Sequence, residues 1–243
     1  MGFYHELSKY YKYIFPLNPS TLEFLKANLK SDKKVLDLAC GSGEYTLGLS
    51  ANGINVTGLD LDEAMIKKAK EKAIEEHLNS KFIVGNMLDL KNYFANDEFS
   101  SIFCIGNSLV HLNSADEIKS LLSSINDLLP TGGRLVIQII NYHRIFEKNL
   151  SCLPTIKNED VGIEFIRNYI HNGNKITFNT ILKTPDNGEF VNNIELLPIK
   201  PDELMSMLKS SSFNVIATYG SFKGDEFKPL ESMPFIVVCE KNI

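Results

Sequence analysis

Apolar residues recur along the first 140 positions of the chain in two alternating patterns. Short apolar runs predict five strands, over residues 35–39, 55–59, 81–85, 99–105 and 134–140. Between them lie stretches with apolar residues at helical spacing, clearest over 115–129. Two further helices are predicted over residues 3–30, separated near Pro16. Strands that alternate with helices indicate an α/β fold with a parallel sheet.

The pattern changes after residue 145, where apolar and polar residues alternate one by one. Three strands are predicted over 161–170, 175–183 and 189–197, joined by turns at 172–173 and 185–188. A last helix follows from residue 201, and then two strands, 214–219 and 234–240, which lie too close for a helical crossover and should pair antiparallel. We expect a Rossmann-like α/β fold: a seven-stranded sheet (five parallel strands plus a C-terminal antiparallel hairpin) with an inserted antiparallel β-meander.

This change of pattern divides the chain into two parts. Residues 1–145 and 198–243 are expected to form the α/β domain, with the N-terminal helical segment as a lid over its ligand site. Residues 146–197 are expected to form the inserted antiparallel subdomain. Insertions at the carboxyl edge of a sheet commonly contribute to substrate specificity. The alternative interpretation is that the insertion provides the surface of a homodimer.

Composition and charge exclude several classes of partner. The net charge is −5, with 25 basic and 30 acidic residues, and only three of the basic residues are arginines. There is no basic block with interleaved aromatic residues, so nucleic acid is not an expected partner. The apolar runs are too short to span a membrane, and the N-terminus has no signal-peptide pattern, which favours a cytoplasmic protein. Four cysteines without a CxxC pair or histidines at metal spacing indicate reduced thiols and no metal site.

The stretch from Val35 to Leu49 carries the most specific chemical signal. It predicts a buried strand, a turn of small residues over 40–43, and a helix. Gly41 and Gly43 lack a Cβ, so the backbone can turn sharply and a ligand can approach it closely. The free N–H groups of the new helix lie beside that approach. Open α/β sheets bind ligands at the carboxyl ends of their strands, and this turn follows the first strand.

Two acids indicate which ligand the turn binds. Asp60 ends the second strand, where an acid can accept hydrogen bonds from both hydroxyls of a ribose. The alternative role, capping the next helix, is already available to Asp62. Asp37 lies in the strand that leads into the turn, where a carboxylate disfavours a pyrophosphate and favours a cationic group. An NAD-type oxidoreductase is therefore less favoured than an enzyme with a cationic cofactor.

Together these features resemble the class I S-adenosylmethionine-dependent methyltransferases over residues 35–140 and 201–240. The motif D-x-A-C-G-S-G falls on Asp37 to Gly43, the ribose acid on Asp60, and a G-N-M turn on residues 85–87. The resemblance implies S-adenosylmethionine as the cofactor. It places Ala39, Gly41, Gly43 and Ile105 beside the methionine part, Asp60 on the ribose, Leu61 on one face of the adenine, and Asn86 and Met87 at the adenine edge.

Two segments narrow the resemblance to the glycine and sarcosine N-methyltransferase branch. They are C-I-G-N-S-L-V-H-L at 104–112 and L-V-I-Q-I-I-N-Y-H at 135–143. That branch also covers its cofactor with N-terminal tyrosines, which would correspond to Tyr4 and Tyr10. The arginine that binds the amino-acid carboxylate in that branch is Ile140 here, which argues against glycine itself as the substrate. Arg144 or Arg167 could take over that role.

The resemblance implies methyl transfer to a small-molecule acceptor, and an amine nitrogen is the expected target. His111 is the candidate base, because an imidazole has a suitable pKa and follows the fourth strand. Asn107 could orient the acceptor, and Tyr142 is a further catalytic candidate. For His111 and Asn107 the alternative is a structural role in the turn. Two alternatives for the whole protein stay open: an O-methyltransferase of a hydroxyl or carboxyl metabolite, and a non-catalytic S-adenosylmethionine-binding protein.

Overall fold

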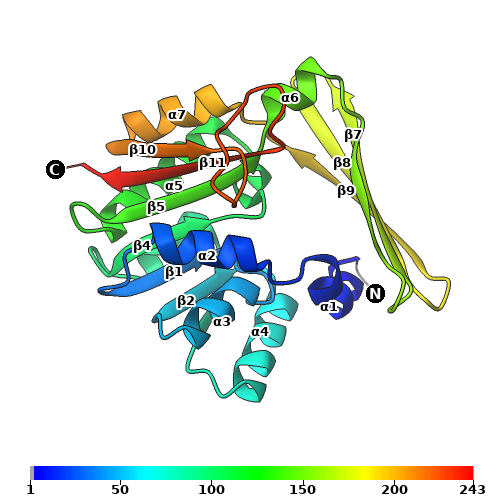
Figure 1. The fold of residues 1–243 in the computed structure, drawn as a ribbon, viewed down its shortest axis with the longest axis horizontal. Helices are drawn as coiled ribbons and strands as arrows, with labels where there is room; N and C mark the ends of the chain where they lie inside the picture. Colours follow the sequence, from blue (N-terminus) through cyan, green and yellow to red (C-terminus); the bar gives the residue numbers. More distant parts are fainter. Residues whose placement is uncertain (1–2, 243) are drawn as a thin grey trace.

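The seven-stranded sheet predicted from the sequence forms the centre of the molecule (Figure 1). The structure is a computed structural model that describes residues 3–242, without the side chain of Tyr4. The strands lie in the order β10-β11-β5-β4-β1-β2-β3. Their bounds are β1 Lys34–Leu38, β2 Val56–Asp60, β3 Lys81–Val84, β4 Phe99–Cys104, β5 Arg134–Ile140, β10 Phe213–Tyr219 and β11 Pro234–Lys241.

The pairing within this sheet confirms the predicted topology. The strands from β1 to β5 pair in parallel, and β11 pairs antiparallel with both β5 and β10. The continuous apolar runs explain the burial, since all six residues of β4 are buried and five of the seven residues of β5 are buried. Helices cover both faces of these strands, so no polar alternation is needed.

Most of the helices pack on the two faces of the sheet, and α1 lies apart from them. Their bounds are α1 Phe3–Ile14, α2 Pro19–Asn28, α3 Glu44–Ala51, α4 Glu63–Glu75, α5 Ala115–Leu128, α6 Tyr142–Glu147 and α7 Pro201–Ser210, with 3-10 turns η1 Met87–Asn92 and η2 Ser108–His111. The apolar sides of α5 and α7 share one core cluster, and those of α2 and α3 share another. Within residues 3–242, the helices are all too short or too polar to cross a membrane.

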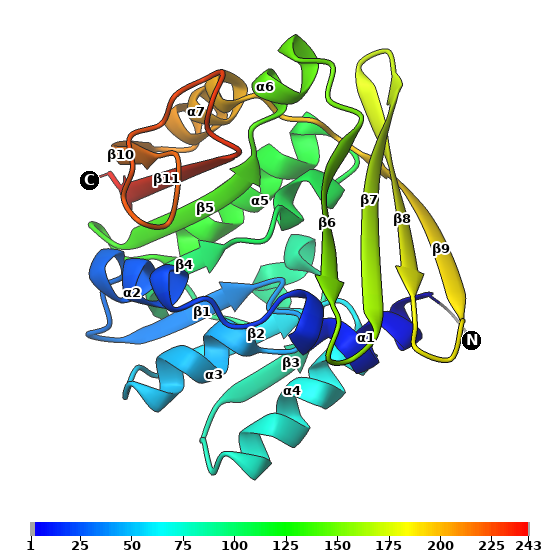
Figure 2. The same ribbon diagram turned by 45° about the vertical axis from the view of Figure 1, so that its right-hand side comes forward.

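A second sheet of four strands, in the order β6-β7-β8-β9, stands beside the first (Figure 2). The strands are β6 Cys152–Asn158, β7 Ile163–Asn172, β8 Lys175–Lys183 and β9 Glu189–Leu196, all antiparallel. The last three confirm the predicted meander, but β6 was not predicted. It is an edge strand whose ladder shifts register between Leu153 and Ile156, around Pro154, which has no N–H to donate.

Helix α1 lies between the two sheets, at the carboxyl ends of β1 and β2 (Figures 1 and 2). It contacts β6 and β9 of the second sheet and α4 of the first domain. Its apolar residues Leu7 and Ile14 are buried in a cluster with Phe165 and Leu182 of the second sheet. The described elements therefore enclose a space between the end of the first sheet, α1 and the second sheet.

Candidate active site

The turn after β1 has a backbone that only small residues allow. Ala39, Gly41 and Gly43 all have positive φ angles, of 60°, 55° and 81°. A Cβ on Gly43 would lie 2.9 Å from the ring of Phe82, closer than real contacts allow. A Cβ on Gly41 would lie 3.1 Å from the hydroxyl of Tyr11, so helix α1 lies directly over the turn. The side chains of Phe82 and Tyr11 therefore approach the backbone of this turn closely.

Three acids gather at this turn. The Asp37 carboxylate is 3% exposed and accepts a hydrogen bond of 2.7 Å from the Thr46 hydroxyl. Asp60 accepts hydrogen bonds from the backbone N–H groups of Gly41, at 2.8 Å, and Asp62, at 2.9 Å. Glu44, the third acid, begins helix α3 and pairs with Lys72. Two carboxylates are therefore held in fixed orientations at the end of the first strand.

Burial changes the protonation of these acids. The pKa of Asp37 is raised to about 7, mainly by burial and also by the charges of Asp60 and Glu44, against the opposing effect of the hydrogen bond from Thr46. Burial also raises the pKa of Asp60, against the hydrogen bonds from the backbone. A cationic group beside these carboxylates would stabilise their ionised forms. The turn therefore suits a small cation that approaches the backbone closely, as a sulfonium or an α-ammonium group does.

A cavity of about 730 Å³ opens from this turn toward the second sheet. Three walls bound it. The first is the end of the parallel sheet, with Asp37, Ala39, Cys40, Glu44, Ile105, Asn107, His111 and Gln138; the second is α1, with Phe3, Leu7, Tyr11 and Ile14; the third is the second sheet, with Leu153, Phe165, Arg167, Tyr169, Phe178, Thr180, Asn192 and Ile194. The volume is in the range of small-molecule sites.

The predicted catalytic residues separate into two groups. His111 lines the cavity from η2; its side chain is exposed, and the protein atoms around the imidazole lower its pKa by removing part of its water. Asn107 also lines it, but its amide is engaged, since Oδ1 accepts from the Ile140 N–H at 2.8 Å and Nδ2 donates to the Tyr142 hydroxyl at 2.9 Å. Tyr142 is 0% exposed and lies behind Asn107, outside the cavity lining. Its contact with Asn107 supports a positioning role.

The residues expected at the ribose and adenine lie beside the cavity rather than in its lining. Asp60 and Asn86 follow the neighbouring strands β2 and β3, which pair through residue 84. The Asn86 side chain caps η1 by accepting from the Leu88 N–H, and the backbone continues through Met87. Leu61 has 71% of its surface exposed, although leucine side chains are usually buried. Of these four residues only Leu61 is exposed; the other three are partly buried.

The N-terminal tyrosines are arranged differently from the expectation. Tyr10 packs in the apolar cluster between α1 and the second sheet and does not line the cavity. Tyr11 does line it and faces Gly41. The side chain of Tyr4 lies outside the described part of the structure. Sequence reasoning named Arg167 but missed Glu44, Gln138, Thr180 and Asn192, which also line the cavity.

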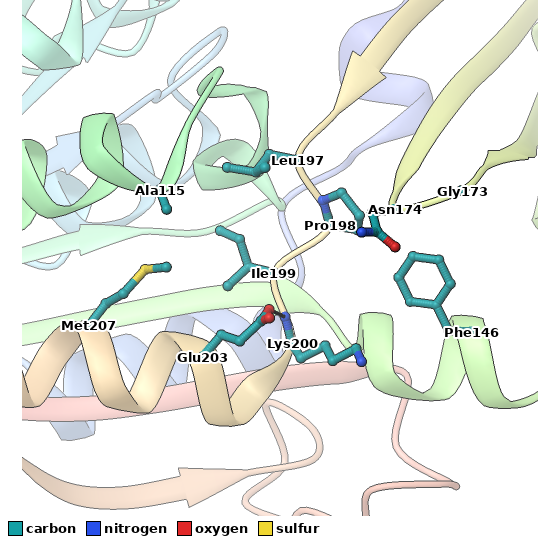
Figure 3. Close-up of a pocket in the computed structure, with 10 residues that line it drawn as sticks. All are labelled: Ala115, Phe146, Gly173, Asn174, Leu197, Pro198, Ile199, Lys200, Glu203 and Met207. Atoms are coloured by element: carbon teal, nitrogen blue, oxygen red, sulfur yellow. Dashed lines mark hydrogen bonds between the residues drawn. The ribbon is translucent and has the colours of Figure 1, made fainter.

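A smaller pocket of about 450 Å³ lies at the base of the second sheet, between α6, α7 and the β7–β8 turn (Figure 3). Its carboxylate, on Glu203, already accepts a hydrogen bond from the Lys200 N–H at 2.8 Å. The Phe146 ring and the Lys200 ammonium face one another across it, 6.0 Å apart. None of its lining residues is a histidine or a cysteine. The larger cavity contains Asp37, Glu44 and His111, and it is therefore the candidate active site.

Comparisons with known proteins show similarity to methyltransferases in sequence and in fold. The family described as "Methyltransferase domain" matches residues 35–133, the stretch from β1 to the end of α5 and its following turn. The fold is similar to that of an S-adenosylmethionine-dependent methyltransferase from Clostridium acetobutylicum, with a TM-score of 0.82, 16% identity and 99% of both chains covered. Residues 35–133 therefore match a methyltransferase domain, and the described chain has the fold of S-adenosylmethionine-dependent methyltransferases.

Among curated proteins, glycine N-methyltransferases are prominent relatives. The rat (Rattus norvegicus) glycine N-methyltransferase is 35% identical over 135 residues, which covers 51% of this chain and 45% of the relative. The glycine/sarcosine N-methyltransferase of Aphanothece halophytica is 25% identical over 83% of this chain and 74% of the relative. The matches span about half or less of the length of several curated relatives.

Proposed function

We propose that the protein transfers the methyl group of S-adenosylmethionine to a nitrogen atom of a small-molecule amine bound in the large cavity. One observation carries the proposal: the acidic glycine turn and the imidazole of His111 face the same cavity. The turn supplies the cofactor side, and the second sheet supplies the opposite wall. The N-methyltransferase names of the relatives favour nitrogen over oxygen as the acceptor atom.

The cofactor side of the proposal rests on the fit of the residues. Ala39, Gly41 and Gly43 would border the methionine part, because they form the turn at the carboxyl end of β1 and Ala39 lines the cavity. Asp60 would hold the ribose hydroxyls, since its carboxylate is fixed beside the turn by backbone N–H groups. Leu61, Asn86 and Met87 would form the adenine site, and Ile105 would contact the methionine end. When bound, S-adenosylmethionine supplies an electrophilic methyl group on a sulfonium sulfur.

Methyl transfer to nitrogen requires a neutral amine and a group that accepts its proton. In the proposed step the nitrogen forms a bond to the methyl carbon while the carbon–sulfur bond breaks, and the sulfur keeps the bonding electrons. The proton of the nitrogen passes to an imidazole nitrogen of His111, which is available because the partial loss of water favours the neutral ring. Asn107 and Tyr142 hold the ends of β4 and β5 in register around this point. Alignment and exclusion of water supply most of the rate enhancement.

The test is a methyl-transfer assay on purified protein. Release of S-adenosylhomocysteine should be measured over matched panels of primary and secondary amines, alcohols and carboxylic acids, with mass spectrometry of the products. Transfer to amines supports the proposal. Transfer to oxygen alone would contradict it in favour of an O-methyltransferase. Tight cofactor binding without transfer to any member of the three panels would favour a binding protein.

A further inference from the structure

One row of polar side chains crosses the otherwise apolar inner face of the second sheet. Arg167 of β7 pairs with Thr180 of β8, and Thr180 pairs with Asn192 of β9, so the three side chains lie side by side across the sheet. All three line the large cavity. The rows on either side are apolar or aromatic: Phe165, Leu182 and Phe190 on one side, and Tyr169, Phe178 and Ile194 on the other.

Two members of this row each have a buried polar atom without a hydrogen-bond partner among the described residues. One terminal nitrogen of Arg167 donates to the Pro154 carbonyl at 2.5 Å, but its buried Nε has no partner. The hydroxyl of Thr180, a residue only 3% exposed, also has none. Of the other two arginines, Arg134 pairs with Glu240, and Arg144, whose buried Nε also has no partner, contacts Met233 and lies outside the cavity lining. Buried polar groups without partners are uncommon and indicate a ligand.

The charge of Arg167 is unusual for its place. Its side chain forms none of the ion pairs found within residues 3–242. Burial lowers the pKa of its guanidinium, and Tyr169 is the nearby group that opposes this shift. Taking a cation out of water without an opposite charge costs free energy, so such a group is retained where a ligand supplies the charge. A guanidinium binds a planar carboxylate particularly well, through parallel hydrogen bonds.

We infer that the methyl acceptor carries a carboxylate group, which the second sheet binds through Arg167 with the Thr180 hydroxyl beside it. The inference rests on the proposed function and adds the chemical class of the acceptor: an amine that also bears a carboxylate. The cavity is then divided by charge. Asp37 and Glu44 at the glycine turn face the cationic cofactor, and Arg167 on the opposite wall faces the anionic end of the acceptor. The amine lies between them, toward His111.

This arrangement differs from the one that the sequence resemblance implied. At the end of β5, where an arginine was expected to hold a carboxylate, the chain has Ile140, which also lines the cavity. The positive charge therefore lies on the second sheet instead of the first, and the acceptor would bind in a different orientation. Because the neighbouring rows are aromatic, the space beside Arg167 suits a carboxylic acid larger than glycine.

The binding test uses benzoate as a probe, with benzamide as its uncharged counterpart. Affinities are measured by isothermal titration in the presence of S-adenosylhomocysteine for the unaltered protein, Arg167→Met and Lys183→Met. Lys183 is the control, since it lies on the exposed outer face of the same sheet. Benzoate should bind at least about 10-fold more weakly to R167M than to the unaltered protein or K183M, in line with the strength of charged hydrogen bonds. Equal benzoate affinity in R167M, or none in the unaltered protein, would overturn the inference.

The activity test uses acid and amide pairs: β-alanine with β-alaninamide, and phenylalanine with phenylalaninamide. The ratio of kcat/KM for acid over amide should fall about 10- to 100-fold in R167M and stay unchanged in K183M. The amine basicity differs within each pair, but that difference is the same in every variant and cancels. An unchanged ratio would overturn the carboxylate assignment. If no amine is methylated while benzoate binding still depends on Arg167, the proposed function fails and the anion site stands.

Folding of the variants is checked independently. Removing a partly buried cation that has no carboxylate partner should leave the thermal midpoint of R167M equal to or above that of the unaltered protein. Arg167→Lys is the second variant, because it keeps the charge and loses the planar fork; its benzoate affinity should lie between those of the unaltered protein and R167M. Benzoate that binds R167K no better than R167M would show that charge plays no part, and would overturn the inference.

Discussion

At the scale of single residues, the chemistry depends on how desolvation changes protonation. His111 and Asp37 line the same cavity, and desolvation moves their pKa values in opposite directions. The charged form is disfavoured in both, which leaves the imidazole neutral and keeps the carboxyl protonated up to about pH 7. A neutral imidazole can accept a proton. A carboxyl with a raised pKa ionises readily when a cation binds beside it.

His111→Gln should lower turnover by about 100-fold or more, because a positioned base contributes 10²- to 10⁴-fold. Cofactor affinity should change little, since the imidazole faces the cavity from η2 and lies apart from the glycine turn. Turnover should rise with pH through the lowered pKa of the imidazole, because only the neutral ring accepts a proton, and this dependence should disappear in the variant. Steady-state kinetics from pH 5 to 9 and titration with S-adenosylhomocysteine measure both effects.

His143→Gln is the matched control for this experiment. His143 lies in α6, directly after the Tyr142 that supports Asn107, and is not part of the cavity lining. Its replacement should leave turnover within about twofold, the range usual for a substitution away from the site. If His111→Gln retained full turnover and the same pH profile, His111 would have a structural role in the turn, and the base would have to be sought elsewhere.

At the scale of elements, the helix α1 connects the two halves of the active site. Its Tyr11 faces Gly41 of the turn, while Leu7 and Ile14 pack with the second sheet. An element that contacts both walls can cover the cavity when cofactor and acceptor are bound and exclude water from the reaction. The lid predicted from the sequence therefore remains a proposal with a definite contact, between a tyrosine ring and the glycine turn.

Tyr11→Ala should weaken cofactor binding by about 10-fold, since it removes an aromatic ring that covers the turn and buries apolar surface. Tyr10→Ala is the control, because Tyr10 lies on the same helix but outside the cavity lining. It should lower the thermal midpoint with little effect on the affinity for S-adenosylhomocysteine. Titration calorimetry and thermal unfolding of the two variants distinguish these outcomes. Equal losses of affinity in both would mean that α1 acts only through its packing.

Most elements of the α/β domain could be predicted from the sequence because their signals are local. The strand bounds of β5 match the apolar run at 134–140, and α1 and α2 lie on either side of Pro16. Strand β6 could not be predicted, since its pattern is polar, contains Pro154, and is stabilised by pairing with β7. Helix α6 was also missed, because six residues after a strand carry too little periodicity to reveal a helix.

The candidate site could be predicted in its residues of the first sheet and less well elsewhere. Strand ends in a parallel sheet meet at one edge, so Asp37, Asn107 and His111 could be brought together by topology alone. The rotation of a helix cannot be deduced in that way, and Tyr11 rather than Tyr10 faces the turn. Arg167 shares one face of its strand with Phe165 and Tyr169. What this face contacts could not be predicted, because it depends on how the two sheets pack.

The outer face of the second sheet bears on the dimer hypothesis. The middle of this face carries a ladder of amides, in which Asn168 donates to Asn179 at 3.1 Å and Asn179 donates to Asn193 at 2.9 Å. Beside it, Val191 has 52% and Ile170 has 50% of its surface exposed. These amides satisfy each other's hydrogen bonds within the sheet, so this face is stable in contact with water. A homodimer through this surface stays a prediction from the sequence.

At the scale of the whole molecule, the cavity is lined by segments that are far apart in the chain. The acidic wall comes from residues 37–44, and the basic wall from residue 167. Since neither wall is complete without the other, folding of the second sheet onto α1 creates the site. Because folding buries Asp37, the free energy of unfolding depends on whether its carboxyl group is protonated.

The affinity for S-adenosylmethionine should rise as the pH increases from about 6 to 8. The pKa of Asp37 is raised to about 7, mainly by burial, so the carboxylate that attracts the sulfonium forms only over this range. S-adenosylhomocysteine lacks the positive charge on sulfur and should show a weaker dependence. In Asp37→Asn, an amide of the same shape, the affinity for S-adenosylmethionine should fall about 10-fold at pH 8 and change little at pH 6. Titration calorimetry with both ligands at the two pH values measures this difference.

The same substitution should stabilise the protein when no cofactor is bound. The pKa of Asp37 is about 7 in the folded protein against an ordinary value of 3.8, so the folded state binds the extra proton between these values and its stability falls as the pH rises through that window. Asp37→Asn removes this loss and should raise the free energy of unfolding at pH 8, by up to about 4 kcal/mol, with little change near pH 4. Urea unfolding of both proteins at pH 4 and pH 8 provides the measurement. Equal differences at the two pH values would show that Asp37 is already ionised in the folded protein, and that the attraction of the turn for a cation does not depend on its titration.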